Sequence, residues 1–292
     1  MDARLLIAAV VTAFLAASVY SGIGAGLEAY GPGPLSLLRL LAASAALGIY
    51  ALLSRSVCLP TVRDLPGAAL SGLLGFGLYN AALAYGQTTV SAGTAGLLHA
   101  SVPVFTALLA VAFLGERLGS LAWAGIAVSF SGAALISLGE GGGLRFDAGA
   151  LLVLLSAISA SLYFVVQKPY LERYGALEFT AYSIWTGTLF LSPFLPELVG
   201  EARGPDGGNV ERGLRGGLHH RGRLLDPRLR LLAAAGLQGG GGELPDPPLA
   251  LAIAWIWLGE TPTVVAAAGG VTTLLGVALV NTRNESRASG DP

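Results

Sequence analysis

The sequence predicts an all-α polytopic membrane protein built as an inverted 5+5 helix repeat, and three observations predict it: composition, run length and internal repetition. Of the 292 residues, 53% are apolar and only 12% are charged. Soluble domains carry about 25% charged residues, so this chain cannot cover a water-facing surface. The apolar residues gather in runs close to the roughly 20 residues that cross a bilayer as a helix. These runs lie at 5–22, 35–53, 67–86, 93–114, 119–138, 149–167, 179–195 and 263–281.

The composition also excludes several classes of protein. The net charge is −1, and no basic stripe indicates binding to nucleic acid. The one cysteine, Cys58, lies in a polar loop, which excludes a disulfide framework and a cysteine-based metal site. We therefore expect no metal and no cofactor. The first 25 residues could be interpreted as a signal peptide, but a segment near residue 160 repeats them, which favours a first span.

An internal repeat organises the chain. The tripeptide Leu114-Gly115-Glu116 returns as Leu258-Gly259-Glu260, 144 residues later. At the same spacing Pro103 matches Pro247, Gly125 matches Gly269 and Gly132 matches Gly276, while Tyr20 and Tyr163 match one residue out of step. The chain is therefore predicted to hold one repeat at 1–140 (spans 1–5), a second at 141–285 (spans 6–10) and a polar tail at 286–292.

The repeats are predicted to have opposite orientations in the membrane. Five spans are an odd number, so the second copy enters from the other side, which is a transporter architecture with its substrate site between the halves. The distribution of basic residues agrees with this arrangement and places both termini in the cytoplasm. The residues expected on the cytoplasmic side are Arg4, Arg55, Arg63, Arg117, Lys168, Arg173, Arg283 and Arg287.

The two units resemble a known family. Each closes with the Leu-Gly-Glu tripeptide followed by a Gly-rich last helix, and Arg39 and Pro103 also fit the pattern of the EamA-type branch of the drug/metabolite transporter superfamily. The resemblance covers the chain except for about 201–246. It implies ten helices and the export or exchange of small metabolites or drug-like compounds, without naming a substrate.

One stretch departs from the repeat. Residues 201–246 are rich in Arg and Gly where the repeat requires the eighth span and the first part of the ninth. An arginine at a helix centre costs roughly 2.5 to 3.5 kcal/mol, so the stretch does not span as written. We expect no complete eighth helix, at most a short helical piece at 224–235, and a ninth helix reduced to about 248–258.

The residue types of this stretch indicate a shifted reading frame. Ser, Thr, Ile, Phe, Tyr, Trp, Lys, Met, Cys and Asn have codons that begin with T or A, and only Asn209 represents them in these 46 positions. Read one base out of frame, 224–230 is compatible with a Tyr-Leu-Thr-Leu-Ala-Tyr-Ala segment, which resembles residues 80–86 of the first copy. A natural frameshift, a sequencing error and a genuine solvated basic insertion are the alternatives.

Polar residues inside the spans are the candidates for a substrate path, because they are costly in lipid and face the bundle interior. The candidate substrate-binding residues are Tyr20, Asn80, Tyr85, His99, Ser159, Tyr163, Gln167 and Trp185. His99 and Pro103 share a face of the fourth span, where the proline frees a backbone carbonyl. For the serines and tyrosines, bonding to neighbouring backbone or joining helices is the alternative.

Other residues belong to the repeat motif and are expected to be structural. They are Arg39, Pro103, Gly115, Glu116, Pro247, Gly259 and Glu260. Arg39 can reach the membrane interface by extending its side chain, which favours a structural or lipid-headgroup role over substrate binding. The two glutamates lie at helix ends, where fixing the turn is favoured over gating.

The leading hypothesis is a secondary transporter in the cell membrane that works by alternating access on a small-molecule substrate. A transport-inactive frameshifted product is the alternative. A membrane-embedded enzyme is disfavoured, because no acidic pair lies mid-span and Ser129-Phe130-Ser131-Gly132 is a poor nucleophile motif. The lipid bilayer is the expected environment, nucleic acid is not an expected partner, and a homodimer is left open.

Overall fold

The computed structural model describes residues 18–54, 60–115, 118–140, 147–203 and 263–288, and these parts are helical, without strands. After a first helix at 18–27, the elements are α2 Pro32–Ser54, α3 Leu65–Gly72, the π-helix η1 Leu73–Leu78, α4 Tyr79–Gly86, α5 Ala92–His99, α6 Val102–Leu114, α7 Ser120–Glu140, α8 Ala148–Leu171, α9 Ala176–Leu191, the 3₁₀ turn η2 Ser192–Phe194, α10 Leu195–Ala202 and α14 Val264–Ala288. The predicted all-α class is confirmed for the described residues.

The helices are long and apolar enough to cross a membrane. Four candidate spans lie at Pro32–Leu53, Leu65–Gly86, Ala92–Phe113 and Ala148–Leu171, and shorter apolar helices lie at Ser120–Ile136 and Val264–Val280. Each corresponds to one of the apolar runs of the sequence. The predicted run at 179–195 ends early, because α9 stops at Leu191 and Pro193 starts a tight turn before α10.

The predictions for the Arg- and Gly-rich stretch fall almost wholly outside the described residues. Only its first residues are described, and Glu201 and Ala202 form the end of α10. The expected helical piece at 224–235 and the reduced ninth helix at 248–258 lie outside the described parts and stay predictions. The same holds for Glu116, Pro247, Gly259 and Glu260.

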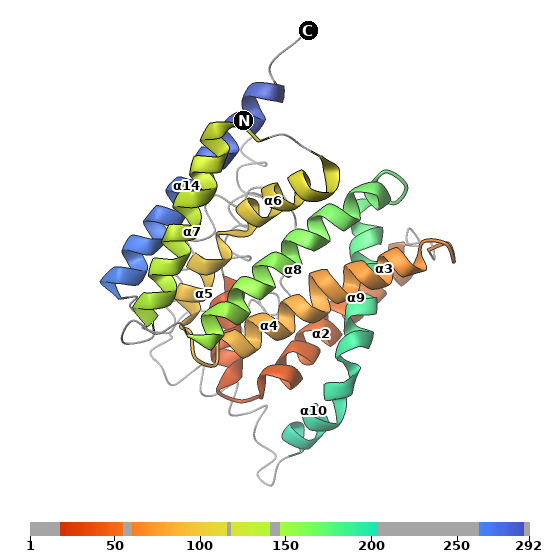
Figure 1. The fold of residues 1–292 in the computed structure, drawn as a ribbon. Helices are drawn as coiled ribbons and strands as arrows, with labels where there is room; N and C mark the ends of the chain where they lie inside the picture. The colour runs from red at the N-terminus through yellow and green to blue at the C-terminus, as the bar shows by residue number, and fades with distance from the viewer. Residues whose placement is uncertain (1–17, 55–59, 116–117, 141–146, 204–262, 289–292) are drawn as a thin grey trace, which may run out of the picture.

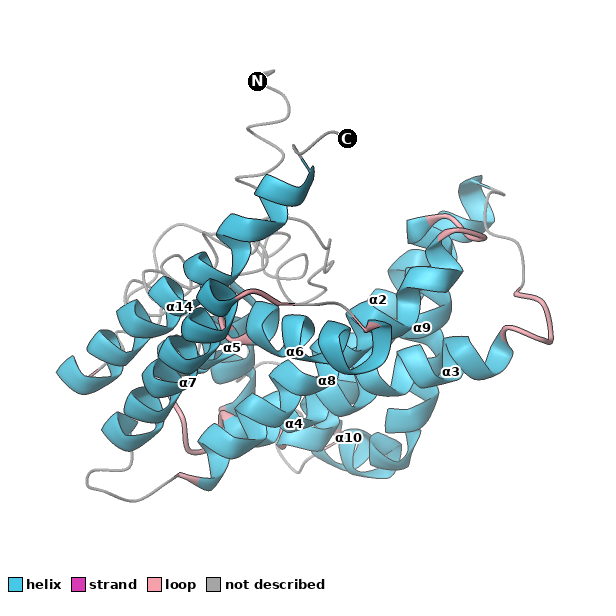
Figure 2. Ribbon diagram, turned by 45° about the horizontal axis from the view of Figure 1, so that its top comes forward, coloured by secondary structure: helices cyan, strands magenta, loops and turns pink. Residues whose placement is uncertain are grey.

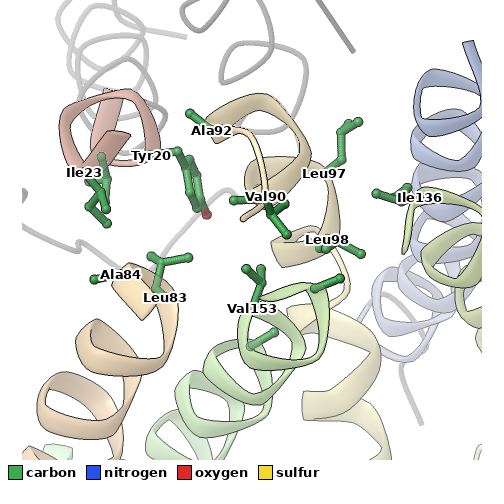
Figure 3. Packing of buried hydrophobic residues seen from close by; sticks show 14 of the residues in the cluster. Tyr20, Ile23, Leu83, Ala84, Val90, Ala92, Leu97, Leu98, Ile136 and Val153 are labelled. Carbon is green, nitrogen blue, oxygen red and sulfur yellow. The ribbon is translucent and has the colours of Figure 1, made fainter. Parts of the chain in front are cut away.

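The helices form two flanks, and α4 and α8 pack together between them. α7 and α14 run side by side on one flank, and α2, α3 and α9 lie on the other (Figures 1 and 2). α8 crosses between the flanks and packs against α4 and α6. The buried apolar core at this crossing includes Tyr20 and Ile23 of the first helix, Leu83 of α4, Leu98 of α5 and Val153 of α8 (Figure 3).

The flank of α7 and α14 is closed by glycines. A Cβ atom built on Gly125 would lie 2.7 Å from the Gly276 carbonyl oxygen, and one on Gly269 would lie 2.7 Å from the Gly132 carbonyl oxygen. Small residues let membrane helices approach until their backbones touch. The Thr273 hydroxyl, 144 positions after Ser129, lies 3.5 Å from the Ser129 carbonyl oxygen in the same seam.

Two spans in the centre are irregular. The span Leu65–Gly86 changes from α to π over Leu73–Leu78, and the span Ala92–Phe113 breaks at Ala100 and Ser101. π-turns inside α-helices are frequent at functional sites. Both irregularities fall midway along their spans, so they place backbone groups outside the regular α-helical hydrogen-bond pattern in the middle of the bundle.

Candidate functional site

The centre of the bundle holds a hydrogen-bonded pair, Arg39 of α2 and Asn80 of α4. The Arg39 Nη1 atom donates to the Asn80 Oδ1 atom at 2.7 Å. The Asn80 Nδ2 atom donates to the Phe76 carbonyl at 2.8 Å, and the Ser36 hydroxyl donates to the Asn80 carbonyl at 3.1 Å. The Asn80 amide oxygen therefore has a donor and the amide nitrogen has an acceptor, and these two bonds fix the orientation of the amide. Arg39 points into the bundle and not along the expected path to the membrane interface.

The π-helix explains why Asn80 can do this. A π-turn leaves backbone carbonyls without their usual α-helical donors, and side chains then satisfy them. The Phe76 carbonyl accepts from the Asn80 side chain and the Tyr79 N–H, and the Leu74 carbonyl accepts from the Ser159 hydroxyl at 2.7 Å. Asn80 is therefore held by the turn that directly precedes it.

Aromatic rings lie beside this pair. The rings of Tyr20 and Tyr79 pack against the His99 imidazole, with centroids 5.7 and 5.5 Å from it. The Arg39 guanidinium lies within electrostatic range of both tyrosine hydroxyls. Tyr20 comes from the first helix and points toward α4 and α5 (Figure 3). Four separate elements thus bring Arg39, Asn80, His99 and the two tyrosines together; we call these five residues the central polar cluster.

The helix break positions His99. It is the last residue of α5, and Ser101 bonds the Leu98 carbonyl through both its N–H, at 3.1 Å, and its hydroxyl, at 2.7 Å. Pro103 has no N–H to offer the His99 carbonyl one turn back. In the part of the chain that the structure describes, the His99 Nε2 atom has no hydrogen-bond partner. The imidazole thus brings an unused polar atom to the centre.

The charge of the central polar cluster is unbalanced among the described residues. The hydrogen-bond partner of Arg39 is a neutral amide, and the ion pair found in the described chain joins Arg173 and Asp64, at an end of the bundle. Arg39 and His99 are both half-buried, although each lies in a membrane span. Arg39 thus brings a cation with some exposed surface to the middle of the bundle, where a charge is costly without a partner.

Three other predicted site residues make contacts between helices; for Ser159 and Tyr163, contacts of this kind are the alternative that the sequence left open. The Ser159 hydroxyl bonds the Leu74 carbonyl, and the Trp185 Nε1 atom donates to the Ser44 carbonyl at 3.3 Å. The Tyr163 ring packs on Phe76 with a centroid distance of 5.5 Å. None of the three lies in the central polar cluster.

The remaining predicted residues lie farther out. Tyr85 is 40% exposed near the end of α4, and Gln167 is half-buried one residue before the exposed Lys168. Among the motif residues, Gly115 ends α6 with a φ of 66°, the left-handed conformation that glycine adopts without strain. Pro103 lies in the first turn of α6, just after the break.

Sequence reasoning missed Tyr79, which packs on His99 directly beside Asn80. The sequence did hold a signal for an irregular helix just before Tyr79, because Gly75 and Gly77 weaken the helix there. Sequence reasoning also missed contacts that join distant segments at the ends of the bundle. Among the described residues, no group of three or more His, Cys, Asp or Glu side chains could hold a metal ion.

The Asp64 end of the bundle is a network of charged and polar side chains. The two Asp64 carboxylate oxygens accept from Arg173 Nη1 at 3.1 Å, from the Tyr174 hydroxyl at 2.8 Å and from the Thr61 hydroxyl at 2.8 Å. Hydrogen bonds from Tyr174 and Thr61, with the nearby positive charges of Arg173 and Arg63, lower the pKa of Asp64 below its usual value. The network ties the start of α3 to the turn between α8 and α9.

The other end of α9 carries a different contact. The Gly31 N–H points at the Glu201 carboxylate of α10, with distances of 3.2 and 3.3 Å to its two oxygens. Burial, and then the charge of Glu201, raises the pKa of the neighbouring Tyr30. We call the two ends of the bundle that hold these contacts the Asp64 end and the Glu201 end.

Interrupted spans and polar residues in the interior of a helical bundle are typical of membrane transporters. The chain belongs to the EamA-like transporter family, whose model matches residues 3–138 and 147–204. It is an integral membrane protein.

Two relatives and one solved structure extend this result. The chain is 40% identical, over 96% of its length and 94% of the relative's, to a protein of Streptantibioticus cattleyicolor named as a probable terminal-alkyne amino-acid exporter. It is 38% identical to the uncharacterized transporter YdfC of Bacillus subtilis, over 89% of this chain and 85% of that one. A crystal structure at 19% identity covers 96% of this chain and 98% of its own with a TM-score of 0.56, which shows a shared fold.

Proposed function

We propose that the chain is a secondary transporter that exports small metabolites of the amino-acid type across the cell membrane by alternating access. The observation that carries this proposal is the central polar cluster, in which Arg39 and His99 stay half-buried between two interrupted spans. The relative from Streptantibioticus cattleyicolor, named as an amino-acid exporter, supports the substrate class. Transport then requires that the cluster be reached from one side of the membrane at a time.

We infer that the parts that move during transport are two inverted repeats, at 1–140 and 141–285, with both termini in the cytoplasm. Contacts that relate the two copies through the 144-residue spacing support this arrangement. A two-fold relation makes residue i contact residue j of the other copy while j contacts i. Gly125 contacts Gly276 and Gly132 contacts Gly269, a crossed pair under the spacing of 144. The hydroxyls of Ser44 and Thr188, also 144 positions apart, lie 2.7 Å from each other.

A topology experiment tests the inverted arrangement. In a Cys58→Ser background, cysteines at Arg55 and Lys168 should react with a membrane-impermeant thiol reagent from the cytoplasmic side only. A cysteine at Gly143 should react from outside only. Labelling of position 168 from outside would contradict the inverted repeat.

A transport experiment tests the function. Proteoliposomes that contain the purified full chain and unlabelled amino acids should accumulate the matching radiolabelled amino acid by counterflow, and empty liposomes should not. His99→Ala should slow this exchange about tenfold or more without lowering the amount of protein in the membrane, because it removes a polar group from the cluster and little packing. His99→Phe should be slower still, because it adds bulk there. Unchanged exchange in both variants would remove His99 from the transport path.

A transport-inactive product is the second candidate, and the Arg- and Gly-rich stretch at 201–246 is the observation that favours it. Resequencing codons 195–250 and assaying the chain beside its frame-restored counterpart separates the two. Exchange by the restored chain alone would assign inactivity to the stretch. Equal exchange by both would show that the stretch is tolerated.

A further inference from the structure

We propose that Arg39 is the receptor for a carboxylate group on the transported molecule and that Asn80 holds the guanidinium in place for it. This inference rests on the proposed function, because it concerns the substrate of the same site. It goes beyond that function by assigning one chemical group of the substrate to one side chain.

The charge of the described spans supports this assignment. Within the four long candidate spans and the two shorter apolar helices, Arg39 is charged and lies away from a helix end, whereas Lys168 lies in the last turn of α8. A cation in the middle of a membrane is costly unless an anion or a set of dipoles offsets it. The groups found near Arg39 are the Asn80 amide and two tyrosine hydroxyls, all of them neutral. A substrate carboxylate would supply the missing negative charge.

The geometry prepares the guanidinium for such a ligand. Arginine carries five N–H donors in a planar fork, and its contact with Asn80 occupies one nitrogen, Nη1. Asn80 is itself fixed, because its Nδ2 atom bonds the Phe76 carbonyl of the π-turn. Asn80 therefore orients the guanidinium, and the other N–H donors of Arg39 stay available for a substrate carboxylate. A planar fork of donors matches the two oxygens of a carboxylate.

A single guanidinium favours a monoanion over a phosphate. Phosphate groups carry close to two negative charges at neutral pH, and the described spans bring no second cation to Arg39. The rings of Tyr20, Tyr79 and His99 offer apolar faces beside the guanidinium. Aromatic faces bind apolar groups and also attract ammonium ions. The cluster thus fits a molecule with one carboxylate and a small body, as in an amino acid.

A binding experiment with matched compounds tests the carboxylate. The purified full chain in detergent is heated with L-amino acids and simple monocarboxylates, with the corresponding amides, and with inorganic phosphate, and the shift of the unfolding temperature is measured. We expect stabilisation by one or more carboxylates and none by their amides or by phosphate. Arg39→Gln should weaken this binding at least about thirtyfold, as expected when a buried charge partner is lost. Arg63→Gln, which removes an exposed arginine, should leave it unchanged.

Asn80→Asp gives a second test, in a variant that keeps Arg39. The variant places a carboxylate 2.7 Å from the guanidinium nitrogen, at the present position of the amide oxygen. It should abolish the carboxylate-dependent shift, because the protein now supplies its own anion. The variant also loses the hydrogen bond from Nδ2 to the Phe76 carbonyl, so the readout is the ligand-dependent shift and not the unfolding temperature of the free protein. Thr88→Asp adds the same charge at the exposed end of the span and should keep the ligand response.

The possible outcomes separate the inference from the proposed function. If amides stabilise the chain as well as carboxylates do, if phosphate alone stabilises it, or if Asn80→Asp keeps the full response, the inference is wrong. Absence of any carboxylate-dependent shift also overturns it. In each of these cases, counterflow of another compound would leave the proposed transport standing. If no compound shows counterflow but carboxylates still bind, the proposed transport function is wrong and the proposed carboxylate binding by Arg39 stands.

Discussion

The two ends of the bundle join the same halves of the chain with different chemistry. At the Asp64 end, three side-chain donors from both halves converge on one carboxylate, and an ion pair is among them. At the Glu201 end, a carboxylate of α10 meets the backbone N–H of Gly31. α9 lies between these ends, running from the turn after α8 to α10 (Figure 1). One end is thus a side-chain network and the other a contact between a side chain and the backbone.

This difference indicates which end responds to solution conditions. A network built on a carboxylate with a lowered pKa depends on the charge of that carboxylate and is weakened when it is protonated. The Glu201 end also has an apolar contact, because the Phe194 ring packs directly against the backbone of Gly33. Removing the carboxylate there leaves the ring in place. We therefore expect the Asp64 end to open more readily after a single change.

The largest effect is expected from Asp64→Ala, which removes the shared acceptor of all three donors. A cysteine at Ala68, which is 1% exposed one turn into α3, reports opening of this end in a Cys58→Ser background. Its reaction with a thiol reagent should accelerate on the order of tenfold, since a hydrogen-bonded charge is lost. Glu172→Ala, which removes an exposed carboxylate at the same end, is the control. Equal acceleration in both variants would contradict the network.

A smaller effect is expected from acid. The pKa of Asp64 is lowered in the folded protein, so its contribution to stability is complete above the ordinary aspartate pKa of about 3.9 and is lost as the pH falls through the lower folded value. The labelling rate at position 68, taken relative to that of Asp64→Asn at the same pH because the thiolate fraction falls in acid, should therefore rise below about pH 4. The rise should be smaller than in Asp64→Ala, because a protonated carboxyl still accepts hydrogen bonds. The ratio of the two rates should be constant above this range. A ratio that does not change as the pH falls would assign the acid response to another group.

The helices could be predicted from the sequence because their signal is local. Long apolar runs and the 144-residue spacing depend only on residue order, and the described spans follow the runs closely. The π-turn could not be predicted in this way, since it depends on packing between distant segments. Gly75 lies directly against the Tyr163 ring, and the Leu74 carbonyl needs the Ser159 hydroxyl. Both partners come from α8, almost 90 residues later in the chain.

The candidate site was only partly predictable for a related reason. Tyr20, Asn80 and His99 were identified as polar residues within spans, and the structure brings these three together. Tyr163, the repeat partner of Tyr20, faces Thr180 and Ser183 of α9 instead. The direction of Arg39 was not predictable, because its position in a helix allows both an extended side chain and an inward one. The hydrogen bond to Asn80 decides between them, and the π-turn creates that bond.

The smallest effect is expected at the Glu201 end, from Glu201→Gln. The amide oxygen can still accept from the Gly31 N–H, and the Phe194 contact remains, so a cysteine at the buried Leu198 should react no more than about twofold faster. The sharper reporter is Tyr30, whose pKa is raised by burial and then by the charge of Glu201. Glu201→Gln removes the second cause only, so the pKa of Tyr30 should fall but stay above its ordinary value. An alkaline absorbance titration, corrected with Tyr30→Phe, measures this change, and Glu197→Gln, at an exposed position of α10, is the control. A Tyr30 pKa that is the same in Glu201→Gln would show that this end closes by apolar packing alone.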